Sequence, residues 1–168
     1  DYLPVAVATL NEQQRLALLE AAQGDRRANV LQAPKVTIFN GTQFFVQDCT
    51  QTPFIVGIQD VSEGVQQPKI KVIDEGIKVA MRAIQRGGTA KVRLEGRIEL
   101  SEIAEVRTAS TLLRGKPATI QIPRIKRCRI EVASELDDRQ SLLIGCIPTY
   151  EKKQFLYVLL TVRNLETN

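Results

Sequence analysis

Histidine is absent from the 168 residues of this chain, and its absence removes most of the common catalytic chemistry. Without an imidazole there is no general base for the usual catalytic triads, and the commonest protein ligand of transition metals is missing. Asp137 and Asp138 are adjacent carboxylates in a turn-forming stretch, which explains them better than acid–base catalysis. Gly87 and Gly88 precede a strand pattern and lack the helix that a phosphate-binding loop needs. We therefore expect a protein that is not an enzyme and has no cofactor.

Cysteine is scarce as well, with only Cys49, Cys128 and Cys146 in the chain. None of them has the Cys-x-x-Cys spacing of a zinc site, and no histidine can complete one, so we expect no bound metal. One disulfide with a free thiol would fit an oxidising compartment, and three reduced thiols would fit equally well. The cysteines therefore leave their own redox state open.

Long apolar runs are also missing. No run approaches the roughly 18–20 apolar residues that a membrane-spanning helix needs. A composition of 43% hydrophobic and 25% charged residues is that of a folded domain and argues against bulk disorder. A chain of this length builds one domain, so we expect residues 1–168 to form a single domain.

The charge is weakly unbalanced, at +4 near neutral pH. This balance permits anionic lipid or nucleic acid as a partner. The densest basic run is RIKRCR at 124–129, and elsewhere lysine, arginine and glutamate are interleaved along strand-like segments. A solvated or ion-paired strand face explains this run better than a nucleic-acid site, and we expect no nucleic-acid partner.

The amino-terminal part predicts an extended arm over residues 1–10 and a helix over 11–23. Asn11 can cap the helix, and Gln14 three residues later completes a capping-box pair. The stripe expected to face the core consists of Leu16, Leu18, Leu19 and Ala22.

The stretch VLQAPKVTIFNG at residues 30–41 predicts a tight hairpin over 35–47. Pro34 favours extended backbone before it, and the residues that follow alternate between apolar and polar. Asn40-Gly41 is the strongest short hairpin signal, because both residues tolerate the positive φ of a type I′ turn.

Residues 69–165 predict the strands of a barrel wall. The clearest alternation lies in 90–103, and breaks are expected at 74–76 and at 108–117. A strand of this length suits a tall barrel or a tubular wall better than a small sandwich. The fold expected is mainly β, with one N-terminal helix followed by an antiparallel meander of about eight long strands. The apolar face of 90–103 carries Val92, Leu94, Ile98 and Leu100. The opposite, polar face carries Lys91, Arg93, Glu95, Arg97 and Glu99.

Three groups of residues occur in an order that resembles the core domain of the bacterial secretins. At the front, a helix ending in Gly-Asp precedes Val-Leu-x-x-Pro-Lys and Asn-Gly, within 24–41. In the middle, an acidic-Gly turn leads into a strand at 72–83. At the back, Ile-Pro-x-Ile and Arg127 precede an aliphatic run that ends in glycine, within 122–145. The residues that match family motifs are Pro34, Asn40, Gly41, Gly76, Pro123, Arg127 and Gly145.

This resemblance implies a homo-oligomer of many subunits, each of which contributes strands to one shared β-barrel. Such a ring would be a channel for protein secretion or export across the outer membrane, with the polar face of 91–99 toward its lumen. The implied partners are further copies of the chain, outer-membrane lipid, and an exported protein or pilus as cargo. The implied location is the bacterial outer membrane or periplasm.

Several positions depart from the family pattern. Asp138 stands where the family usually has glycine, and Cys146 stands where it has a second glycine. The segment 148–154 is shorter than the usual variable segment, and the family's N-terminal ring domains have no counterpart in these residues. Two alternatives therefore stay open. One is a secretin-derived ring- or tube-forming scaffold without transport, and the other is a monomeric β-barrel or sandwich that binds a small or anionic ligand.

Overall fold

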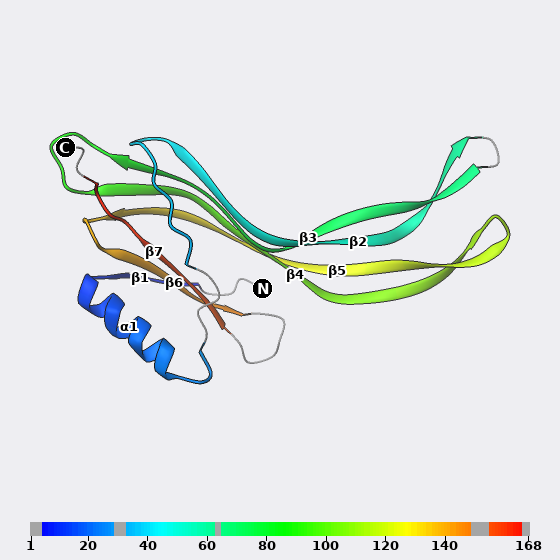
Figure 1. Ribbon diagram of the computed structural model, residues 1–168, viewed down its shortest axis with the longest axis horizontal. Coiled ribbons are helices and arrows are strands. Elements are labelled where there is room, and N and C mark those ends of the chain that lie inside the picture. The colour runs from blue at the N-terminus through cyan, green and yellow to red at the C-terminus, as the bar shows by residue number, and fades with distance from the viewer. Residues whose placement is uncertain (1–4, 29–32, 63–64, 149–154, 166–168) are drawn as a thin grey trace. The chain divides into compact units, whose positions relative to one another are not determined.

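The computed structural model describes residues 5–28, 33–62, 65–148 and 155–165, which form seven strands and one helix (Figure 1). Their order along the chain is β1 (Ala6–Leu10), α1 (Glu12–Gly24), β2 (Gln43–Ser62), β3 (Val65–Gln85), β4 (Val92–Leu113), β5 (Lys116–Leu136), β6 (Ser141–Pro148) and β7 (Phe155–Thr161). The expected fold class, mainly β with one N-terminal helix and antiparallel strands, is confirmed.

The strands form two sheets. Strands β2 to β5 lie side by side in sequence order, and each is 20 to 22 residues long. Strands β1, β6 and β7 form a second, three-stranded sheet with β6 in the centre. In this smaller sheet Ala8 pairs with Leu143 on one side of β6, and Leu143 pairs with Leu159 on the other. The long meander is therefore a separate sheet with its own two edges, β2 and β5.

The described residues form seven strands and not eight, since the predicted break at 74–76 is absent, whereas the break predicted at 108–117 is present as a short turn. β3 runs without interruption through 74–76, where Gly76 has a positive φ of 140° that glycine tolerates within a strand. β4 and β5 likewise continue through most of 108–117. They meet at a two-residue turn of Arg114 and Gly115, whose φ values are 51° and 74°. Positive φ at both positions is the type I′ geometry of a tight hairpin.

The predicted hairpin over 35–47 is wrong. Residues 33–39 form no strand, and only the return strand, β2, is present. A turn does exist, because the Thr42 amide donates to the Phe39 carbonyl at 3.0 Å. Gly41 has φ 78°, but Asn40 is not among the residues with positive φ, so the turn is not type I′. The side chain of Asn40 instead bonds to the backbone of Gln85 at the end of β3.

The helix prediction is confirmed in place but not in packing. Asn11 caps α1, and its side chain and that of Gln14 form the expected capping box. Leu16 and Leu18, however, are 48% and 38% exposed, and no residue of the helix is fully buried. Leu19 and Ala22 are half-buried, so α1 lies beside β1 with only a narrow apolar stripe covered.

The chain divides into two compact units, which the long strands pass through. The first contains Asp1–Val46, Val79–Ile98 and Ile130–Asn168; the second contains Gln47–Lys78 and Glu99–Arg129. The first unit buries side chains from both sheets, namely Met81, Val92, Leu94, Ile98, Val132, Leu136, Leu142 and Ile144. The second unit buries Phe54, Ile73 and Ala104. The expectation of one domain over 1–168 stays a prediction.

Candidate functional site

The polar face of β4 is the first candidate surface. Val92, Leu94 and Ile98 are buried on one side of the strand, as the alternation predicts. Arg93 and Glu95 on the other side are half-buried, and Arg97 is exposed. The part of this face in the first unit is therefore a polar wall that water can reach. Its assignment to a channel lumen stays a prediction, as it does for Lys91, which precedes β4, and for Glu99 in the second unit.

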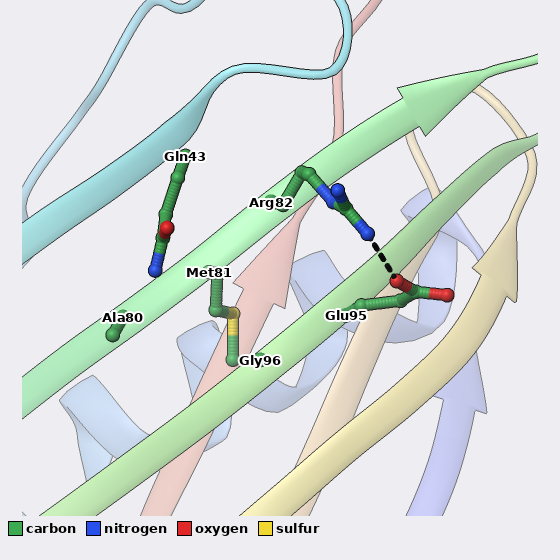
Figure 2. Close-up of a pocket in the computed structure, with 6 residues that line it drawn as sticks. All are labelled: Gln43, Ala80, Met81, Arg82, Glu95 and Gly96. Carbon is green, nitrogen blue, oxygen red and sulfur yellow. Dashed lines mark hydrogen bonds and ion pairs between the residues drawn. The ribbon is translucent and has the colours of Figure 1, made fainter.

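The charges on this face are paired with one another. Arg82 of β3 lies 3.0 Å from Glu95 of β4 (Figure 2). Arg93 also bonds to the Glu95 carboxylate. The hydrogen bonds from Arg82 and then Arg93 lower the pKa of Glu95 below its ordinary value of 4.5. Glu95 therefore stays ionised at neutral pH and holds two strands at one register.

A hollow of about 280 Å³ opens beside this ion pair in the first unit. Gln43 of β2, Ala80, Met81 and Arg82 of β3, and Glu95 and Gly96 of β4 line it (Figure 2). Both charged residues of the lining bond to each other, so they do not present a free charge to a small ligand. The described residues contain no group of acidic or cysteine side chains that could hold a metal ion.

Close backbone packing explains the hollow's position. A β carbon added to Gly96 would lie 2.6 Å from Cα of Met81 and would also meet the carbonyl oxygen of Ala80. Gly76 repeats this arrangement in the second unit, where an added β carbon would meet the carbonyl oxygen of Asp48 and lie 2.9 Å from Cα of Cys49. Only glycine allows the neighbouring strand to come so close.

The two edges of the long sheet are the second candidate surface. Within the described residues β2 has β3 as its strand neighbour and β5 has β4, so each has one side without a strand partner. β2 carries Asp48 and Asp60 and no lysine or arginine. The charged residues of β5 are mainly basic: Lys116, Arg124, Lys126, Arg127 and Arg129, against Glu131 and Glu135. The edges therefore have opposite charge.

In the second unit, prolines and one hydrogen bond reduce the number of free backbone donors on these two edge strands. Pro53 lies in β2, and Pro117 and Pro123 lie in β5. The backbone amide of Ile55 in β2 donates to Oε1 of Gln121 in β5 at 3.1 Å. The two edge strands, β2 and β5, are thus in contact within one chain through the Gln121 side chain. The sequence pattern does not predict this contact.

The family-motif residues do not converge on one site. Asn40 and Gly41 form the turn that joins the end of β3, where the Gly41 amide donates to Ala83. Pro34 lies in exposed backbone without regular structure. An added β carbon on Gly145 of β6 would lie 2.5 Å from the ring of Tyr157, so this glycine makes room for an aromatic side chain.

The other three motif residues lie in the second unit. Gly76 is in β3, and Pro123 and Arg127 are in β5. Pro123 is half-buried and Arg127 is exposed. Apart from Pro34, the motif residues thus stand at a turn, at close backbone contacts and in one edge strand, and their structural role stays a prediction.

The structure describes the side chains of two of the three cysteines. Cys49 and Cys128 are free thiols, and both are half-buried. The Cys49 thiol lies 3.6 Å from the carbonyl of Ile77, and burial raises its pKa. Cys49 is therefore a protonated thiol at neutral pH. The side chain of Cys146 is outside the described part.

Sequence reasoning missed the contact between Ile55 and Gln121, and it predicted a break over 108–117 without locating the Arg114-Gly115 turn. The turn left a weak signal, because glycine followed by lysine and proline marks a break, but arginine is an unusual residue at positive φ. The Ile55–Gln121 bond left no signal, since it joins strands at opposite edges of a sheet. No described helix is long and apolar enough to cross a membrane.

Comparison with known protein families identifies the family that this chain matches. The family model described as "Secretin: Bacterial type II and III secretion system protein" matches residues 21–155. No curated protein and no solved structure matches the chain. The matched region contains the last turn of the helix, the whole four-stranded sheet and β6.

Proposed function

The chain belongs to the secretin family, and on that premise we propose that it is the repeating subunit of a closed homo-oligomeric ring. Family membership assigns the protein to secretion at the bacterial envelope. The finer proposal is a β-walled channel that passes an exported protein or pilus across the outer membrane, without enzymatic activity of its own.

The observation that carries this proposal is the four-stranded sheet with two edges of opposite charge. Its strands are 20 to 22 residues long, so long lengths of backbone on β2 and β5 have no strand partner in the described chain. Four strands are too few for a barrel with a passage, since about eight are needed before the interior is even filled by side chains. Pairing of β5 with β2 of a neighbouring copy would satisfy both edges and close a ring.

The exposed apolar side chains of the second unit support burial in an assembly or in lipid. Large aliphatic side chains are at least one-third exposed on all four of its strands: Ile55, Val61, Ile70, Val72, Val106, Leu112 and Ile122. This unit buries few side chains of its own. Exposed apolar surface of this kind marks contact with a partner or a membrane.

A scaffold that forms a ring or tube without transport is the second candidate. It is favoured by the short connection between β6, which ends at Pro148, and β7, which begins at Phe155. A short connection leaves little chain to build a gate across a channel. Both candidates share the ring and differ only in transport.

Electron microscopy of the purified protein together with a bilayer measurement tests the proposal. We expect closed rings of many subunits that give stepwise conductance in a planar lipid bilayer. Rings without conductance would leave the scaffold and remove the channel. Particles of one subunit would remove both and favour a monomeric β-structure that binds a ligand.

A further inference from the structure

The net positive charge of the chain comes from one stretch, residues 106–130. It contains seven lysine and arginine residues and no aspartate or glutamate. Without this stretch the chain would have more acidic than basic residues. The stretch covers the end of β4, the turn at 114–115 and most of β5. A concentration of one sign of charge favours a partner of the opposite sign.

The neighbouring part of β3 has the same character. Residues 65–73 contain Lys69 and Lys71 and no acidic residue, and β3 is the strand neighbour of β4. The backbone amide of Arg114 donates to Oε1 of Gln66 at 2.9 Å. This bond places the start of β3 beside the turn between β4 and β5, at one end of the long strands (Figure 1). We define the cationic end as residues 65–73 and 106–123.

Four cations of the cationic end are exposed and make no ion pair with a residue that the structure describes: Lys69, Lys71, Arg114 and Lys116. The carboxylates that adjoin the cationic end in the sequence are Asp74 and Glu105, and they bond to Lys78 and Arg107. At about 3.3 Å per residue, both lysines of β3 lie within about 17 Å of Gln66 along the strand. The four charges are therefore gathered at one end of the sheet and are open to an external anion.

The backbone at Arg114 gives independent support for a use of this charge. Arg114 has φ 51°, a conformation that favours glycine or asparagine in a tight hairpin turn. A larger side chain is strained there, and strain of this kind is often found at functional positions. An arginine at this place points to a role for the guanidinium.

Aliphatic side chains are exposed beside these charges. Ile70 and Val72, which alternate with the two lysines of β3, are 63% and 54% exposed, and Leu112 before the turn is 64% exposed. Lysine and arginine combined with exposed aliphatic side chains fit the surface of a bilayer with anionic headgroups.

Aromatic side chains are missing from this surface. The chain has no tryptophan, and the second unit has one aromatic residue, Phe54, which is buried. Tryptophan and tyrosine commonly hold proteins at the membrane interface, and the bases of single-stranded nucleic acid stack on aromatic side chains. The cationic end offers neither contact, which leaves charge and aliphatic side chains as its means of binding.

We propose that the cationic end binds the anionic headgroups of a bilayer surface, with lysine and arginine as anchors in place of aromatic side chains. Their ammonium and guanidinium groups donate to phosphate oxygens, and the aliphatic side chains enter the headgroup region. The proposal rests on the envelope function proposed above and names the class of lipid. It does not require that the ring is closed.

Flotation of the full chain with lipid vesicles tests the proposal. One set of vesicles is phosphatidylcholine alone, and the other has one-third of it replaced by phosphatidylglycerol. We expect at least about tenfold tighter binding to the anionic vesicles, since each cation near an anionic surface contributes about fivefold. Raising the salt concentration should weaken this binding. Equal binding to the two kinds of vesicle would overturn the proposal.

Charge-neutralising variants locate the binding surface. We expect Arg114→Gln with Lys116→Gln, and separately Lys69→Gln with Lys71→Gln, to weaken binding to anionic vesicles at least about tenfold. Arg26→Gln with Lys35→Gln is the matched control, because it removes two exposed cations from the first unit and should change binding less than about twofold. A control as weak as the two test variants would show that net charge alone matters and would overturn the proposal.

Two competitors and one mass measurement separate the remaining outcomes. Release from vesicles by inorganic phosphate, but not by chloride of the same ionic strength, would assign a single phosphate site and overturn the bilayer surface. Tighter binding to a DNA oligonucleotide than to anionic vesicles would also overturn it. Light scattering gives the subunit number separately. Rings without a preference for anionic vesicles would leave the proposed function and remove this inference, whereas a monomer with that preference would do the reverse.

Discussion

The side chain of Asn40 is joined to the backbone of Gln85 by two hydrogen bonds. Its amide nitrogen donates to the Gln85 carbonyl at 2.8 Å, and its oxygen accepts from the Gln85 amide at 2.7 Å. Asn40 thereby takes the place of a strand residue at the end of β3. These bonds hold the turn at 40–41 to the end of β3, and residues 33–39 before it form no strand.

Replacing this side chain tests its role. We expect Asn40→Ala to lower the free energy of unfolding by about 1–2 kcal/mol, since each hydrogen bond contributes about 0.5–1.5 kcal/mol net. Urea titration of the protein measures the change. Gln23→Ala on the exposed face of α1 is the control and should be nearly neutral. An Asn40→Ala protein as stable as the parent would show that the two bonds add nothing.

The close approach at Gly96 predicts a larger effect. A β carbon at this position would meet the backbone of Ala80 and Met81, and φ is 156°. We expect Gly96→Ala to cost about 2–4 kcal/mol in urea unfolding, from backbone strain and overpacking. Gly87→Ala is the matched control, because its β carbon meets nothing within 4 Å. Equal stability of the two variants would mean that the strands can separate at Gly96 without cost.

The two faces of β4 should respond in opposite ways to substitution. Leu94 is 5% exposed, so Leu94→Asp buries a charge without a partner and should cost at least about 3 kcal/mol and prevent assembly. Arg93→Gln with Arg97→Gln should cost less than about 1 kcal/mol per charge and change ion selectivity if the ring conducts. Urea unfolding and bilayer conductance measure the two effects. Similar damage from both would contradict a polar wall.

Acid should weaken the Glu95 pairs in a defined range. Arg82 and Arg93 hold the folded-state pKa of Glu95 below 4.5, its ordinary value. The pairs therefore stabilise the fold fully above about pH 4.5 and lose their contribution as pH falls through the lowered pKa. Stability measured against pH for the parent and for Glu95→Gln should differ at neutral pH and converge in acid. A difference that persists at pH 2 would contradict this assignment.

The sequence predicted the elements that strong local signals determine. The capping box of Asn11 and Gln14, the alternation of Val92, Leu94 and Ile98, and the turn at 137–140 all depend on neighbouring residues. The family resemblance also rested on the order of short motifs, and the match over 21–155 confirms it.

The sequence failed where distant contacts override a local preference. Asn40-Gly41 has the composition of a type I′ turn, but the bonds from Asn40 to Gln85, 45 residues away, select another geometry. The sequence predicts a turn at Gly76. In the structure Gly76 lies inside β3, because a β carbon there would collide with the backbone of the neighbouring strand, β2. The Ile55–Gln121 bond joins residues 66 positions apart in the two edge strands, and no short pattern encodes it.

The mass of the purified protein in solution tests the central claim most directly. Light scattering coupled to size exclusion at micromolar concentration should give one species with a mass many times the 18.7 kDa of a single chain. A monodisperse particle of about 18.7 kDa with native strand content would contradict the ring, and with it both the channel and the scaffold.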